Sequence, residues 1–236
     1  MIVYFLPIDS MGYYRIAALF VAMLKTIPDS VGFIMFPSIR EHYGRFKDLK
    51  LLINHVEKPT VIIATFLLFG IGAVIITTPF AIQYFLPQYQ SGILPANILV
   101  AGFFFMGLIS VHSSFLVSAD EQNSIIFLQL FDVIIAIALN YLLIKMGMGL
   151  FGVAIATAIV YFLHGNIILW ITYSKLAYSL TNKIKNILLY NFCFAACMIF
   201  LICITKYYIY NSDGTVNLIN TASGLLIYGL YVLGLM

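Results

Sequence analysis

The feature that most constrains this chain is a succession of long apolar runs separated by short polar segments. The run 59–85 contains no charged residue, and comparable runs cover 93–117, 124–144 and 150–173. A helix of about 20 mostly apolar residues crosses the hydrocarbon core of a bilayer, and it satisfies its own backbone hydrogen bonds there. The sequence therefore predicts an all-α fold, a polytopic membrane helix bundle with about seven transmembrane helices.

The composition agrees with a chain that is solvated mostly by lipid. Charged residues make up 9 % of it, whereas soluble domains contain about 25 %. The net charge of +3 is small and dispersed, so we expect no nucleic-acid partner. The predicted membrane spans are 16–37, 59–85, 93–117, 124–144, 150–173, 186–205 and 218–235.

The first predicted span carries charges in its middle. Lys25 and Asp29 lie about 15 and 21 Å along a helix from Arg15, which places them near the bilayer centre. A Lys or Asp there costs roughly 2.5–3.5 kcal/mol on insertion scales. Their i, i+4 spacing allows them to pair, and Pro28 between them predicts a kink. Two interpretations stay open: these charges border a substrate cavity, or they form a salt bridge that joins two helices.

Other polar side chains interrupt the later spans. Asp132 lies near the middle of the fourth span, Asn140 lies further along the same helix, and His164 lies in the fifth span. Ionisable groups within a membrane face a bundle interior or a water-filled cavity by default. We therefore predict Asp132, His164 and Asn140 as polar or coupling residues of a cavity. For His164 an interhelical hydrogen bond is an equally open interpretation.

The segment 38–58 is the most basic loop, with Arg40, Arg45, Lys47 and Lys50 among its residues. Its apolar residues recur at helical spacing, which predicts a short helix in the headgroup layer with the basic residues at the membrane surface. A solvated basic loop is the alternative. Because 38–58 and 174–185 hold most of the Lys and Arg, the positive-inside rule predicts that both loops and the C-terminus are cytoplasmic.

Motifs of enzymes are missing from the sequence. No cluster of His, Cys, Asp and Glu has metal-ligand spacing, no glycine-rich phosphate loop follows a strand, and no Ser–His–Asp arrangement is recognisable. We therefore expect no catalytic residues, no metal and no cofactor, and we do not expect an enzyme.

Four stretches together resemble a known family. They are MGYYRIA at 11–17, the segment from IP at 27–28 to FPSI at 36–39, LPQYQS at 86–91, and the segment 140–158, which begins NYLLI and ends GVAIATA. Their order and spacing are similar to the C-terminal half of polysaccharide flippases in the multidrug/oligosaccharidyl-lipid/polysaccharide (MOP) exporter superfamily. The resemblance covers residues 1 to about 175 and, more weakly, the last two predicted helices.

The resemblance implies a fold and a function. It implies a second lobe of a MOP/MATE-like fold, with 1–15 a remnant of a preceding transmembrane helix and outer loop, 16–175 a five-helix part of the lobe, and 176–236 two additional transmembrane helices. It also implies a flippase that moves lipid-diphosphate-linked oligosaccharides across a bacterial inner membrane in O-antigen (lipopolysaccharide), capsule or exopolysaccharide biosynthesis. Lys25 would then bind the diphosphate, Asp29 would tune Lys25, and Asp132 would couple transport to a proton or cation.

Such flippases have two lobes, so we expect a fragment or a truncated reading frame. The expected partners are the membrane bilayer, the lipid-linked oligosaccharide and the missing N-terminal half. Two other functions stay open from the sequence: a MATE-like drug/cation antiporter, with Asp132 as a cation site, and a membrane enzyme of glycan assembly such as a polymerase or ligase.

Overall fold

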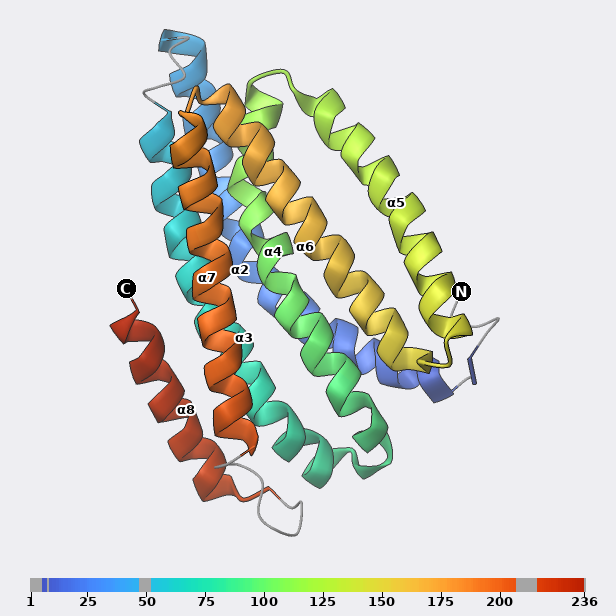
Figure 1. Ribbon diagram of the computed structural model, residues 1–236. Helices are drawn as coiled ribbons and strands as arrows, with labels where there is room; N and C mark the ends of the chain where they lie inside the picture. Colours follow the sequence, from blue (N-terminus) through green and yellow to red (C-terminus); the bar gives the residue numbers. More distant parts are fainter. Residues whose placement is uncertain (1–5, 8, 47–51, 207–215, 236) are drawn as a thin grey trace.

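In a computed structural model of the chain, every element of the described residues is helical (Figure 1). The structure describes residues 6–7, 9–46, 52–206 and 216–235. The elements are α2 (Asp9–Phe46), α3 (Ile53–Phe85), the short 3₁₀ helix η1 (Pro87–Gly92), α4 (Ile93–Ser118), α5 (Gln122–Lys145), α6 (Gly149–Lys175), α7 (Leu180–Ile204) and α8 (Leu218–Gly234).

The predicted fold class is confirmed. Six of the described helices, α2 to α7, are long and apolar enough to cross a membrane. Helix α8 has 17 residues, a rise of about 25 Å at 1.5 Å per residue, which is at the short end of the lengths that span a bilayer. The chain therefore forms a polytopic helix bundle of the membrane type.

Helix α2 is longer than the sequence predicts. It spans Asp9–Phe46, so residues 9–15 are continuous with the first predicted span. It also continues past Pro37, because a proline within a membrane helix is tolerated when its surroundings satisfy the freed carbonyl. Beyond Pro37 the helix is supported by an i, i+4 ion pair, with Arg45 Nη2 2.6 Å from Glu41 Oε1.

The predicted headgroup helix within 38–58 is not a separate element in the part that the structure describes. Residues 38–46 are the end of α2, and 53–58 are the first turns of α3. Leu52 and Val56 are fully buried, so the start of α3 packs into the bundle.

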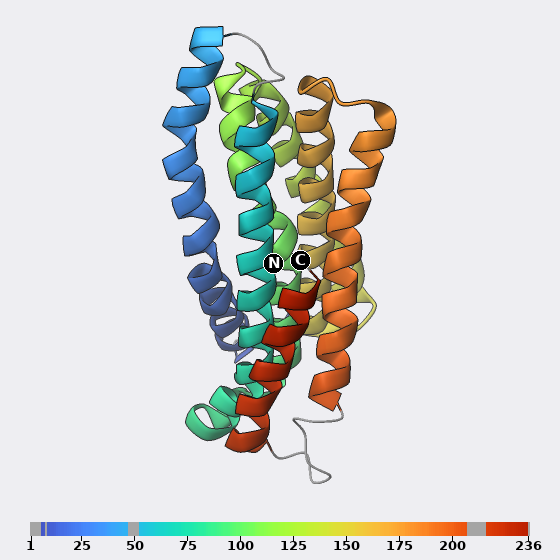
Figure 2. The same ribbon diagram turned by 90° about the vertical axis from the view of Figure 1, so that its left-hand side faces the viewer.

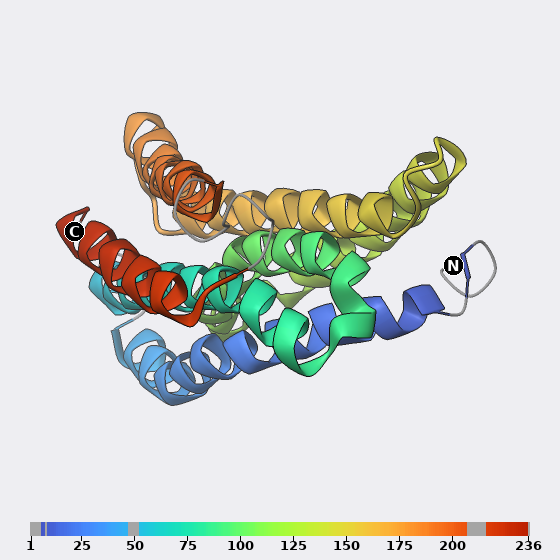
Figure 3. The same ribbon diagram turned by 90° about the horizontal axis from the view of Figure 1, so that it is seen from below.

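Helix α4 is the centre of the bundle. It packs against α2, α3 and α6, and Figure 3 shows it between α2 on one side and α6 on the other. Its membrane window is 67 % buried. Close approach to α6 depends on Gly102, where an added Cβ would lie 2.8 Å from Ala158 Cα. Small residues allow membrane helices to approach each other closely in this way.

Helix α5 stands at the edge of the bundle, beside α6 (Figure 1). Only 6 % of its membrane window is buried. Near its start, Lys175 Nζ at the end of α6 donates to Glu121 Oε1. This hydrogen bond from the lysine ammonium holds the pKa of the Glu121 carboxyl below its ordinary value. The peripheral helix is thus attached to its neighbour by a charged pair at this end.

Helices α7 and α8 complete the bundle by packing against α3 (Figure 2). The Tyr228 ring of α8 lies over Gly72 of α3, and its hydroxyl donates to Leu68 O at 2.8 Å. Tyr228 is 1 % exposed. The last two predicted helices therefore belong to the same bundle as the preceding five.

Candidate functional site

A polar cavity of about 230 Å³ lies among four helices of the bundle. Helices α2, α4, α5 and α6 each contribute to its wall. The residues that line it are Lys25, Pro28, Asp29, Phe103, Met106, Ile109, Ser110, Ser113, Ile125, Gln129 and His164.

The charged residues of this cavity come from α2. Lys25 Nζ lies 2.5 Å from Asp29 Oδ2, and the two side chains are 57 % and 55 % exposed. The predicted i, i+4 pairing is therefore present, and the pair is not sealed among packed neighbours. Because the surrounding residues leave more than half of each side chain uncovered, an approaching charged group can reach Lys25.

The proline between these charges lies against α4. Ser110 Oγ donates to Pro28 O at 2.6 Å, and Ser114 Oγ lies 3.4 Å from Gly32 O. An added Cβ on Gly32 would be only 2.0 Å from Ser110 Oγ, so the two helices approach closely at this point. Figure 2 shows α2 changing direction between its dark blue N-terminal part and its paler remainder, which agrees with the kink that Pro28 predicts.

A second pair of ionisable groups joins α5 to α6. His164 Nδ1 donates to Asp132 Oδ2, and the two side chains are 6 % and 13 % exposed. Asp132 Oδ1 is buried and has no hydrogen-bond partner among the described residues. His164 lines the cavity, whereas Asp132 contacts the site through His164. The structure therefore combines the interhelical hydrogen bond and the cavity position that the sequence left as alternatives.

Some predicted site residues lie elsewhere. Asn140 is not among the described residues that line the cavity, and its Nδ2 donates to Ala136 O in its own helix at 2.7 Å; the structure therefore does not bring it to this cavity. Arg40 lies with its guanidinium carbon 6.0 Å from the centre of the Phe36 ring, and Arg45 pairs with Glu41. Lys47 and Lys50 lie outside the described residues.

Two serines of the cavity were not predicted as site residues. Ser110 and Ser113 both line it from α4. Their i, i+3 spacing places them on one face of a helix, and this was the only signal in the sequence that pointed to them. Among the described residues, no group of three or more His, Cys, Asp and Glu side chains could hold a metal ion.

Together, the fold and the site define a polytopic α-helical membrane protein with a polar cavity inside its bundle. Comparisons with protein families, with curated proteins and with solved structures gave no match.

Proposed function

We propose that this chain is a lobe of a transporter that moves lipid-diphosphate-linked oligosaccharides across a bacterial inner membrane, as the resemblance to MOP flippases implies. The observation that carries the proposal is the Lys25–Asp29 pair, which lines a cavity in the middle of the apolar helix α2. A diphosphate has several charged oxygens, each of which can accept a strong hydrogen bond from an ammonium group. Lys25 is therefore the residue that we assign to the anionic part of the substrate.

The energetics of the pair favour a polar ligand. Each charge costs roughly 2.5–3.5 kcal/mol at the centre of a membrane helix, and both side chains are more than half exposed. Contact with hydrocarbon would leave that cost uncompensated, whereas a watery passage or an anionic ligand offsets it. In this mechanism Lys25 exchanges the Asp29 carboxylate for the diphosphate when substrate enters. A second helical lobe, which MOP flippases possess, would close the passage on the open side of the pair.

A drug/cation antiporter is the second candidate, and one specific observation favours it. Asp132 Oδ1 is buried without a partner, and a buried carboxylate oxygen in this condition attracts a cation or a proton. The carboxylate accepts a hydrogen bond from His164, and His164 lines the cavity. In the flippase the same group would serve as the coupling site, so the two candidates differ in the ligand that Lys25 meets.

Ligand binding to the purified chain in lipid nanodiscs tests the proposal. A fluorescent, short-chain prenyl-diphosphate disaccharide is titrated against the parent chain and against Lys25→Ala. Hydrogen bonds to charged groups contribute roughly 1.5–3 kcal/mol, so we expect Lys25→Ala to weaken binding by about tenfold to a hundredfold. Asp29→Asn, which frees Lys25, should bind at least as well as the parent.

The matched control is Lys145→Ala. Lys145 ends α5, where its Nζ lies 4.8 Å from the centre of the Tyr141 ring, and it does not line the cavity; its removal should leave the affinity unchanged. Equal loss in both lysine variants, or none in Lys25→Ala, would contradict the assignment. Binding of tetraphenylphosphonium that Asp132→Asn abolishes, together with no binding of the diphosphate, would instead support the antiporter.

A further inference from the structure

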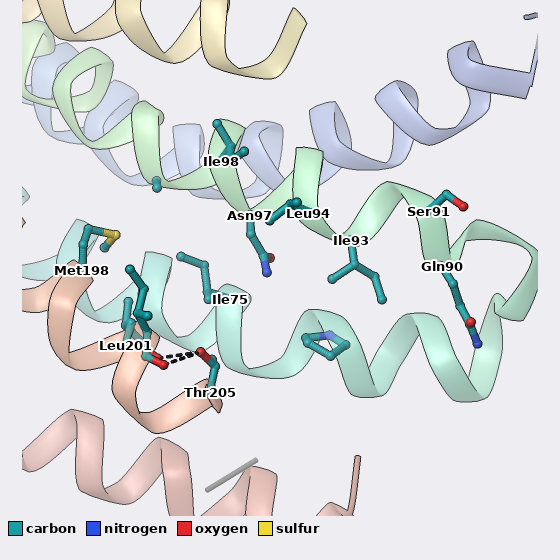
Figure 4. A pocket seen from close by; sticks show the side chains of 13 residues that line it. Ile75, Gln90, Ser91, Ile93, Leu94, Asn97, Ile98, Met198, Leu201 and Thr205 are labelled. Carbon is teal, nitrogen blue, oxygen red and sulfur yellow. Dashed lines mark hydrogen bonds between the residues drawn. The ribbon is translucent and has the colours of Figure 1, made fainter. Parts of the chain in front are cut away.

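A larger cavity lies on the other side of α4, away from the candidate transport site. It has a volume of about 640 Å³ and is enclosed by α3, η1, α4 and α7. Figure 4 shows Ile75 of α3, Ile98 of α4 and Leu201 of α7 around it. None of its lining residues belongs to the cavity of Lys25 and Asp29.

The polarity of this cavity changes along the bundle axis. Gln90 and Ser91 lie at one end, in η1, and both are exposed. Further along the bundle the wall is apolar, with Ala101 and Met198 among its residues. The hydroxyl of Thr205 does not add to its polarity, because it donates to Leu201 O and Ile202 O of its own helix at 2.9 and 3.1 Å.

One polar group within the apolar part has no partner. Asn97 Oδ1 is buried and forms no hydrogen bond among the described residues, and Figure 4 shows the amide pointing from α4 into the cavity. A buried amide that lacks a partner is costly. Half a turn of the amide exchanges its oxygen and nitrogen, so it can offer either an acceptor or a donor to a bound molecule.

Water is a poor occupant for such a cavity. A buried water needs two to four polar partners, and among the described side chains that line the cavity below its rim only the Asn97 amide has an unpaired buried atom. Besides the polar end at η1, the cavity wall includes Leu94 and Ile202, which are 58 % and 63 % exposed. The exposed part of the wall is therefore partly apolar as well. The occupant must therefore be mostly hydrocarbon, with a hydrogen-bonding group about one helical turn below its polar end.

We propose that this cavity binds a membrane phospholipid, with one acyl chain between α3, α4 and α7. Asn97 lies four residues after the start of α4 at Ile93, about 6 Å from the η1 end. The ester carbonyl of a glycerolipid follows its headgroup at the head of the hydrocarbon chain. The headgroup then lies at Gln90 and Ser91, the ester carbonyl accepts from the Asn97 amide, and the chain follows Ile98 and Ala101 toward Met198. This site does not depend on the transport proposal.

Photolabelling of the full chain in nanodiscs tests the phospholipid site. The probe is a phosphatidylcholine with a diazirine in one acyl chain, and labelled peptides are mapped by mass spectrometry. We expect label in α4 and α7 at the cavity, and about two- to tenfold less with an ether-linked analogue that lacks the carbonyl, the range for one neutral hydrogen bond. In Asn97→Leu the ester and ether probes should label equally.

Two tryptophan variants separate a bound lipid from the surrounding bilayer. Ala101→Trp fills the cavity and should remove its label, whereas Ala138→Trp on the exposed face of α5 should not. A thermal unfolding profile like that of the parent shows that each variant is folded, and Asn97→Leu tests the contact with the ester carbonyl separately, without added bulk. Uniform labelling of all helices, or label that excess polyprenyl phosphate removes and excess phosphatidylcholine does not, would overturn the proposal.

Discussion

Asp132 shows how a single buried carboxylate is accommodated in this bundle. Its Oδ2 accepts from His164 and its Oδ1 has no partner within the described part of the chain. Removing one member of a buried pair leaves the other group uncompensated, and this typically costs more than the pair itself contributes. The stability of the α5–α6 contact therefore depends on both residues together.

A double-mutant cycle on this pair measures that dependence. We expect His164→Ala to destabilise the parent chain by about 3–5 kcal/mol, and to destabilise Asp132→Asn by less, because no carboxylate is then left unpaired. The coupling should exceed about 1 kcal/mol. Denaturant unfolding in detergent measures the four stabilities, and additive effects of the two substitutions would show that the pair does not act as a unit.

The sequence predicted part of the candidate site for clear physical reasons. The pairing of Lys25 with Asp29 was predictable because it follows from their spacing on one helix. The pairing of Asp132 with His164 was not predictable. It depends on how α5 and α6 align, and packing sets that alignment. Asn140 shares a helix face with Asp132 but lies about 12 Å further along the axis, and a helical pattern does not show where a cavity ends.

At the scale of the elements, the positions of α3 to α8 follow from the apolar runs, since each run sets the length of a spanning helix. The errors concern α2 and the starts of α3 and α7, which begin at Ile53 and Leu180 and not at 59 and 186. Pro37 was predicted to end the first span, yet α2 includes it and continues to Phe46. Hydropathy marks where a helix enters lipid, whereas its last residue depends on local pairs such as Glu41 with Arg45.

The contact of α4 with α6 is the element-scale feature with the sharpest prediction. Gly102→Ala places a Cβ 2.8 Å from Ala158 Cα, so the helices must separate, and we expect a loss of roughly 1–3 kcal/mol. The control is Gly44→Ala in α2, where nothing lies within 4 Å of the added Cβ. That change should be neutral or stabilising because alanine favours a helix. Thermal unfolding of both variants compares them, and equal melting temperatures would refute the close contact.

For the whole molecule, orientation in the membrane is a prediction from charge. The positive-inside rule places the α6–α7 connection in the cytoplasm and η1 outside. In a chain whose Cys193, Cys197 and Cys203 are replaced by Ala, Gln88→Cys should react with an impermeant maleimide on intact cells. Thr181→Cys should react only after permeabilisation. Both positions are exposed. The reverse labelling pattern would show that the chain has the opposite orientation in the membrane.

The Asp132–His164 pair also has a consequence for biosynthesis. Asp132 leaves the ribosome before His164, and only the short turn 146–148 separates their helices. Had α5 moved alone from the translocon into lipid, its carboxylate would have entered hydrocarbon without a donor. Release of α5 and α6 as one hairpin avoids that exposure, so the order of synthesis and the position of one histidine together favour the two helices leaving the translocon as a unit.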